Sequence, residues 1–127
     1  MTRKPRILIA DDNTDLLAAL KLRLEHCNAE VITAQDGYNA LAKAAQCQPD
    51  ILILDINMPA GDGFSVMGRM SNLPGMKGTK TIFMTGDHSE RLDKMAYDMG
   101  ALEVFHKPLQ MKSLVSTVRA AIQPRAA

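Results

Sequence analysis

Residues Ile51 to Phe64 read "ILILDINMPAGDGF" and carry the strongest structural signal in the chain. Four apolar residues end on one carboxylate, Asp55, and a loop with one proline, two glycines and a second aspartate follows. A short continuous apolar run is typical of a strand buried on both faces, as in a parallel sheet. Because Asp is also common at strand ends, Asp55 is either an ordinary loop residue or a functional group at a sheet edge.

The composition indicates one globular domain spanning residues 1–127, with residues 1–5 and 124–127 as tails. Of the 127 residues, 46% are hydrophobic and 23% are charged. The formal net charge of +1 does not favour a nucleic-acid or anionic-membrane partner. No segment resembles a signal peptide or a membrane span, so we expect a cytoplasmic protein. Cys27 and Cys47 lack metal-site spacing and are expected to be small buried residues.

Short apolar runs alternate with helical patterns along the whole chain. The expected strands are Arg6–Ala10, Val31–Ala34, Ile51–Leu54, Thr81–Met84 and Leu102–His106. The apolar stripes of the expected helices follow Asn13, follow Asp36-Gly37, include Phe64 and Met67, run from Leu92 to Met99, and run from Met111 to Ile122. This alternation predicts an α/β doubly wound domain with a five-stranded parallel sheet, the flavodoxin-like order 2-1-3-4-5, and five helices on two faces.

Several helix ends and buried faces are also predicted. Asn13 is a plausible N-cap of the first helix, and Asp87 with Glu90 resembles a capping box for the fourth. Gly100 is expected to follow the end of the fourth helix, and Pro124 to stop the fifth. The apolar stripe of the second helix includes Tyr38, and that of the fourth includes Met95 and Met99.

Polar residues follow the expected strands at their carboxyl ends. They are Asp11 and Asp12 after the first strand, Asp55 after the third, Thr85 and Gly86 after the fourth, and Lys107 after the fifth. Ligands of open parallel sheets bind outside the carboxyl ends of the strands, near the switch in strand order. With the order 2-1-3-4-5, the three aspartates should converge there, and Thr85 and Lys107 should arrive from the neighbouring strands.

Three carboxylates at one place repel one another unless a cation neutralises them. Mg²⁺ (or Mn²⁺) suits such a site because it prefers one or two carboxylates and leaves positions for water or phosphate oxygens. A carboxylate such as Asp55 is also a nucleophile toward phosphorus and forms an aspartyl-phosphate. Lys107 would supply fixed positive charge, Thr85 a hydroxyl donor and Gly86 a backbone N–H. The bland alternatives are that Asp11 and Asp12 cap the first helix and that Thr85 and Lys107 are ordinary residues.

Four motifs each stand at the end of an expected strand: "ADDN" at 10–13, "DINMPAGDGF" at 55–64, "MTG" at 84–86 and "HKP" at 106–108. Together they resemble a response-regulator receiver domain over nearly the full length of the chain, like the single-domain chemotaxis receiver. The resemblance implies that Asp55 accepts a phosphoryl group from a histidine kinase or a histidine phosphotransfer protein. The chain would then be a signalling switch of a two-component phosphorelay that alters the binding of an unidentified output partner, and it would not turn over external substrates.

The resemblance also implies roles for the surrounding residues. Asp12, Asp55 and the backbone carbonyl of Asn57 would ligate Mg²⁺, and Asp11 would act through a water. Lys107, Thr85 and Gly86 would bind the phosphoryl oxygens, and the Lys107–Pro108 peptide would be cis. Residues 58–63 would form the structured turn into the third helix, and a homodimer would use the face between the fourth and fifth helices.

The fifth strand departs from this pattern. Many receivers carry Tyr or Phe three residues before the strand's lysine, whereas this chain has Val104 there. Phe105 should point to the opposite face of the sheet, so no aromatic rotamer switch is expected. We expect a smaller conformational response, in which Thr85 moves and the loop after it moves with it. His26, His88 and His106 are expected to form no constellation.

Two other functions remain open. One is a constitutive interaction module that keeps the fold without phosphorylation. The other is a Mg²⁺-dependent phosphatase with an aspartyl nucleophile on the first strand. Such enzymes resemble this chain less, because they place a second Asp two residues after the nucleophile, and here Asn13 follows Asp11 at that spacing.

Overall fold

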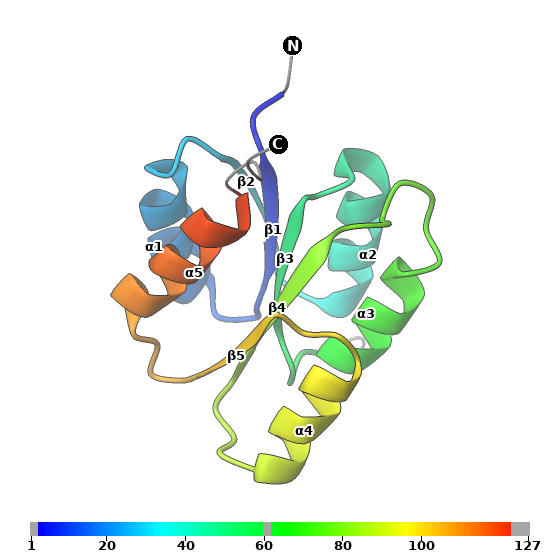
Figure 1. The fold of residues 1–127 in the computed structure, drawn as a ribbon, viewed down its shortest axis with the longest axis vertical. Helices are drawn as coiled ribbons and strands as arrows, with labels where there is room; N and C mark the ends of the chain where they lie inside the picture. The colour runs from blue at the N-terminus through cyan, green and yellow to red at the C-terminus, as the bar shows by residue number, and fades with distance from the viewer. Residues whose placement is uncertain (1–2, 60–61, 123–127) are drawn as a thin grey trace.

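The computed structural model describes residues 3–59 and 62–122 as an alternating α/β domain (Figure 1). Its strands are β1 (Arg6–Ala10), β2 (Glu30–Ala34), β3 (Ile51–Asp55), β4 (Lys80–Thr85) and β5 (Glu103–His106). Its helices are α1 (Thr14–Glu25), α2 (Gly37–Cys47), α3 (Gly63–Met70), α4 (Glu90–Asp98) and α5 (Met111–Ile122). All strand pairs are parallel and the order is β2-β1-β3-β4-β5, which confirms the predicted fold.

The central position of β3 in the sheet explains why its sequence is apolar. It pairs with β1 on one side and β4 on the other, and all five of its residues are buried. Ile51 and Ile53 pack in the cluster under α1 and α5, and Leu52 and Leu54 pack in the cluster under α2 and α3. Figure 1 shows α1 and α5 on one face of the sheet, with α2, α3 and α4 on the other. A strand covered on both faces has no polar side, so it is apolar at every position until Asp55.

The helix ends agree with the sequence at two places and differ at one. The side chain of Asn13 accepts a hydrogen bond from the Leu16 N–H at 3.1 Å, and Gly100 has a φ of +98°, as predicted. The predicted capping box at Asp87 is wrong, because Ser89 is the N-cap of α4 and accepts from the Leu92 N–H at 3.4 Å. Asp87 instead accepts from the Ser89 N–H at 3.0 Å, within the loop before the helix. Pro124, the expected stop of the fifth helix, lies outside the described residues.

Three residues expected on buried stripes are exposed. Tyr38 is 75% exposed because α2 packs through its small residues Gly37, Ala40 and Ala44, which lie on another side of the helix. Met95 and Met99 are 39% and 38% exposed. The physical reason is that α4 lies over β5, a four-residue edge strand that offers little surface to cover.

The remaining expectations concern the cysteines, the chain ends and the membrane. Cys27 and Cys47 are half-buried free thiols, so the expectation of full burial is wrong. Burial nevertheless raises the pKa of the Cys47 thiol. Arg3 lies within the predicted N-terminal tail and pairs with Asp50 at 3.2 Å, and residues 124–127 lie outside the described part. Among the described helices, none has the length and hydropathy of a membrane span.

Candidate functional site

The structure brings the three predicted aspartates together at the carboxyl edge of the sheet. One carboxylate oxygen from each of Asp11, Asp12 and Asp55 lies within 4.8 Å of the others. Asp11 and Asp55 are buried and Asp12 is exposed. Asp11 follows β1 and Asp55 ends β3, and these neighbouring strands bring both residues to the same point. The chain folds this way because continuous apolar strands carry their first polar residue only where they leave the core.

Lys107 reaches this cluster from the end of β5. Its Nζ lies 2.7 Å from Asp11 Oδ2 and 3.2 Å from Asp55 Oδ2. The Lys107 backbone N–H donates to the Thr85 carbonyl at 2.7 Å, and the following peptide to Pro108 is cis, as the resemblance implied. One ammonium faces three carboxylates, so two negative charges of the cluster have no cation among these four residues. Oxygen donors with excess negative charge suit a divalent cation.

The environment shifts two pKa values at the site. Burial raises the pKa of Asp55, the neighbouring Asp11 charge raises it further, and Lys107 and the Asn57 N–H only partly offset this. Burial alone would lower the pKa of Lys107, but the hydrogen bond and charge of Asp11, followed by those of Asp55, outweigh it and raise the pKa. Lys107 is therefore held as an ammonium beside a carboxylate whose ionised form is disfavoured.

The loop after β3 is built closely around Asp55. The Asn57 N–H donates to Asp55 Oδ1 at 3.2 Å. Gly63, at the start of α3, approaches the backbone so closely that a Cβ there would lie 2.6 Å from the Asp55 carbonyl oxygen. Only glycine fits this position without a backbone shift. Asp62 caps α3 by accepting from the Ser65 N–H at 2.8 Å, and the predicted turn residues Ala60 and Gly61 lie outside the described part.

Thr85 connects the site to the loop that leads to α4. The residue is buried at the end of β4, and its Oγ1 accepts a hydrogen bond from the Asp87 N–H at 2.9 Å. Gly86 lies between them and is exposed, with no atom within 4 Å of a Cβ placed there. The Thr85 hydroxyl therefore holds the first turn of this loop, and its orientation is coupled to the loop's position.

The sequence reasoning missed a histidine cluster on the α4 side of the site. The rings of His88 and His106 stack with centroids 5.0 Å apart, and His106 Nε2 lies 3.0 Å from Asp93 Oδ1. The expectation that the histidines form no constellation is thus wrong for His88 and His106, while His26 lies away from them, between α1 and α5. These residues come from a loop, a helix and a strand, and no local sequence spacing joins them. They link α4 to the residue next to Lys107.

The departure at Val104 is confirmed in the structure. Val104 is buried with Phe83 on the face covered by α2, α3 and α4, whereas Phe105 packs toward α1 and α5. From α4, the Tyr97 hydroxyl accepts from the Val104 N–H at 3.3 Å and donates to Glu103 at 2.8 Å. The aromatic contact at this point of β5 therefore comes from the helix and not from the strand.

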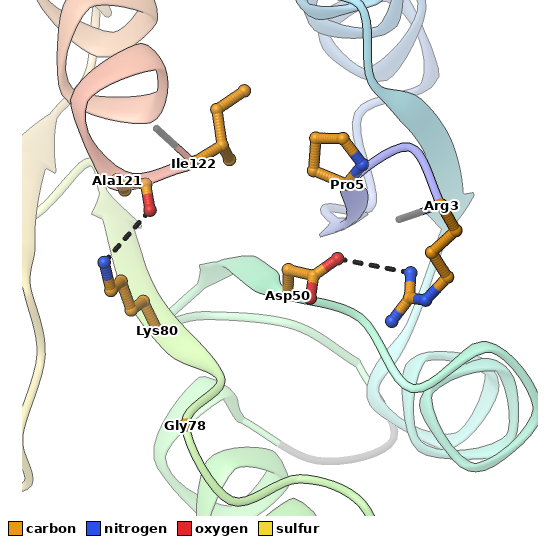
Figure 2. Close-up of a pocket in the computed structure, with 7 residues that line it drawn as sticks. All are labelled: Arg3, Pro5, Asp50, Gly78, Lys80, Ala121 and Ile122. Carbon is orange, nitrogen blue, oxygen red and sulfur yellow. Dashed lines mark hydrogen bonds and ion pairs between the residues drawn. The ribbon is translucent and has the colours of Figure 1, made fainter. Parts of the chain in front are cut away.

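A hollow lies at the opposite edge of the sheet and does not belong to this site. It measures about 640 Å³ and is lined by Arg3, Pro5, Asp50, Gly78, Lys80, Ala121 and Ile122 (Figure 2). Figure 2 shows Arg3 paired with Asp50, and Lys80 Nζ donates to the Ala121 carbonyl at 3.0 Å. Its charged groups are already partnered and it lies at the amino ends of β1, β3 and β4, so we place the chemistry at the aspartate cluster.

Comparison with known families identifies the class of protein. The family model described as "Response regulator receiver domain" matches residues 7–119, and the chain belongs to this family. Receiver domains of response regulators are signalling proteins of two-component systems and not classical enzymes.

Curated relatives and solved structures agree with this family. The chain is 37% identical over 124 residues to "Transcriptional regulatory protein PrrA" of Mycobacterium leprae, covering 97% of this chain and 52% of the relative. It is 33% identical over 120 residues to "Transcriptional regulatory protein KdpE" of Mycobacterium tuberculosis, covering 92% of this chain and 50% of that protein. The chain thus spans about half the length of these curated relatives.

Among solved structures, the chemotaxis protein CheY4 of Vibrio cholerae superimposes with a TM-score of 0.86 at 28% identity, covering 94% of this chain and all of that one (100%). The signal receiver domain of a DNA-binding response regulator from Colwellia psychrerythraea gives a TM-score of 0.87 at 27% identity, covering 95% and 100%. Both the sequence family and the fold neighbours therefore describe the same kind of domain.

Proposed function

We propose that this chain, a single domain over residues 1–127, is a phosphorylation-controlled switch in which Asp55 accepts the phosphoryl group. The observation that carries the proposal is the contact of Lys107 Nζ with both Asp11 and Asp55, next to a third carboxylate, Asp12. The donor would be a phosphohistidine on a histidine kinase or a histidine phosphotransfer protein. The relatives are named transcriptional regulatory proteins, and the match to the response regulator receiver family supports a partner of this kind.

The donor set fits Mg²⁺ (or Mn²⁺), because it consists of clustered carboxylates whose charge Lys107 only partly neutralises. Asp12, Asp55 and the Asn57 carbonyl would hold the ion, and Asp11 would contact it through a water. The bound ion would supply positive charge against the phosphoryl oxygens.

The transfer itself uses the chain's own residues. A carboxylate oxygen of Asp55 attacks phosphorus, the new O–P bond forms, and the P–N bond of the phosphohistidine breaks. The leaving imidazole takes the electron pair and is protonated by solvent. Lys107, the Thr85 hydroxyl and the Gly86 N–H would donate to the phosphoryl oxygens, where transition-state charge develops.

The response would begin at Thr85. Its hydroxyl holds the Asp87 N–H in this structure, and donation to a phosphoryl oxygen would reorient it and release that contact. The loop before α4 would then shift and change the population of states that a partner binds. Exposed Met95, Tyr97 and Met99 on α4 support the α4–α5 face as the output surface, including for a homodimer.

The test is mass spectrometry after incubation with Mg²⁺ and acetyl phosphate. We expect one added phosphoryl group, which Asp55→Asn abolishes. Asp62→Asn is the matched control, because Asp62 is a nearby aspartate that only caps α3, and labelling should persist. An unlabelled wild-type chain would favour a constitutive interaction module. Phosphomonoester turnover that Asp11→Asn removes and Asp55→Asn retains would favour a phosphatase.

A further inference from the structure

A cationic groove is lined by residues of α1 and α5 and by His26. Figure 1 shows these two helices on the face of the sheet away from α2, α3 and α4. The groove measures about 340 Å³, and we call it the α1–α5 groove. Its lining residues are Arg23, His26, Lys112, Val115, Ser116 and Arg119. No acidic residue is among them, although the whole chain has a net charge of only +1. The positive charge is therefore local to this groove.

The permanent cations of the groove have no partners in the protein. Within residues 3–59 and 62–122, the side chains of Arg23, Lys112 and Arg119 form no ion pair and no hydrogen bond, and all three are exposed. By contrast, Arg3 and Lys94 elsewhere on the surface pair with Asp50 and Asp98. Three unpaired cations around one hollow repel one another, and an anion bound between them would relieve this.

The helix dipoles explain only part of this arrangement. Arg23 and Arg119 lie in the last turns of α1 and α5, where a cation is favourable. Lys112 lies in the first turn of α5, beside the positive end of the dipole, where a cation is unfavourable. The placement of Lys112 therefore calls for a different reason, and it lines the same groove as the two arginines.

The spacing of the cations indicates an extended anion. Lys112 and Arg119 are seven residues apart on α5, a separation of about 10.5 Å along the helix. The two long side chains could converge on one phosphate only by losing rotamer freedom, whereas an anion about as long as this separation meets both charges without that cost. Glutamates at positions i, i+4 and i+7 of a second helix repeat over the same length, and half-buried Val115 offers an apolar floor between the charges.

A long polyanion fits the surroundings less well. Asp15 lies in the first turn of α1, and Asp11 and Asp12 precede that helix, so a nucleic acid running along α1 beyond the groove would meet negative charge. A short acidic segment would stay within the positive region. We propose that the α1–α5 groove binds an acidic helical segment of a protein partner. This binding does not depend on phosphorylation of Asp55.

The test uses a synthetic helical peptide with glutamates at i, i+4 and i+7, titrated into the ¹⁵N-labelled full chain. We expect amide shifts confined to α1, His26 and α5, and an affinity that falls as ionic strength rises. Arg119→Glu should weaken binding by about tenfold or more, as charge reversal in an interface does. A peptide with glutamine in place of glutamate should not bind.

Two controls distinguish binding in the α1–α5 groove from a general effect of the protein's net charge. Arg69→Glu makes the same charge change on α3, on the other face of the sheet, and should leave the affinity unchanged. A variant with Arg23, Lys112 and Arg119 all changed to Glu should bind the matching lysine peptide in place of the acidic one. Labelling of Asp55 by acetyl phosphate should persist in Arg119→Glu, so failure of the groove and failure of the switch are distinguishable.

Three results would overturn the assignment. The first is a peptide that shifts residues away from α1, His26 and α5. The second is equal weakening by Arg69→Glu and Arg119→Glu. The third is a DNA duplex or inorganic triphosphate that binds the groove more tightly than the acidic peptide does.

Discussion

The central strands that carry the aspartates are far more buried than the sheet edge formed by β5 and α4. Every residue of β3 is buried between two layers of helices, whereas α4 buries only Ala96. Asp55 thus ends a strand that is buried at every position. The helix beside the site is also held by polar contacts, from Asp93 to His106 and from Tyr97 to Glu103. Such an arrangement fits the proposed switch, because an element with few buried contacts shifts at a lower cost in free energy than a buried strand does.

The largest expected effect tests the difference in packing between β3 and α4. Ile53→Ala in β3 should lower the free energy of unfolding by about 4 kcal/mol, because a fully buried side chain leaves a cavity between two packed layers. Met95→Ala on α4 should change it by less than about 0.5 kcal/mol, since this side chain is 39% exposed. Urea unfolding measures both, and equal losses would contradict the difference between the two regions.

The next effect concerns the charge balance between Lys107 and the buried carboxylates of Asp11 and Asp55. Lys107→Met should lower the free energy of unfolding at neutral pH by about 3 kcal/mol, because it leaves buried Asp11 and Asp55 without their cation. The matched control is Lys94→Met, which removes an exposed pair with Asp98 and should leave the urea midpoint unchanged. A Lys107→Met protein as stable as wild type would show that the pair is not needed to offset the carboxylates.

Bound Mg²⁺ should offset the repulsion among the clustered carboxylates of Asp11, Asp12 and Asp55. At a Mg²⁺ concentration ten times its Kd, the free energy of unfolding of the wild-type chain should rise by about 1.4 kcal/mol. Asp12→Asn should remove most of this rise without changing the packing, because Asp12 is exposed. Thermal unfolding with and without Mg²⁺ checks this, and an unchanged midpoint would count against the proposed metal site.

A smaller effect follows from the raised pKa of Asp55. A raised folded-state pKa means that the stabilising contribution of this carboxyl is fully present below its ordinary value of 3.8 and is lost as pH rises through the folded value. At neutral pH the ionised Asp55 therefore costs stability in metal-free protein. Asp55→Asn should be more stable than wild type at pH 7 without Mg²⁺, and the difference should shrink in acid. Parallel pH titrations of urea midpoints measure it, and a less stable variant at pH 7 would contradict the sign.

The smallest effect tests how α4 is attached. His106→Leu removes the hydrogen bond to Asp93 and should speed amide hydrogen exchange in α4 about fivefold, with little change in global stability. Asp93→Asn keeps a hydrogen-bonding partner for the His106 ring and should leave the exchange rates near wild type. Unchanged exchange in His106→Leu would show that Tyr97 alone holds the helix.

The fold and the site residues were largely predictable because they depend on local patterns. The apolar run ending at Asp55 predicted a central strand, and the polar residues that follow the other strands predicted where the aspartates and Lys107 meet. Tyr38 was missed because α2 packs through its small residues on another side of the helix, and Met95 because helical periodicity does not show how much of an apolar side a neighbour covers. The cap at Ser89 was missed because Asp87 and Ser89 are both good N-caps, and only the backbone path decides between them.

The sequence by itself determined the strand order, the carboxylates at the sheet edge and the opposite facing of Val104 and Phe105. The strand order is the one that five-stranded doubly wound sheets commonly adopt, and the other two features follow from hydrophobic period and the alternation of side chains along a strand. Only the tertiary structure decided the His88–His106–Asp93 cluster and the cationic groove between α1 and α5. Both join side chains from elements far apart in the chain, and their distances depend on how helices pack on the sheet, which no local spacing encodes.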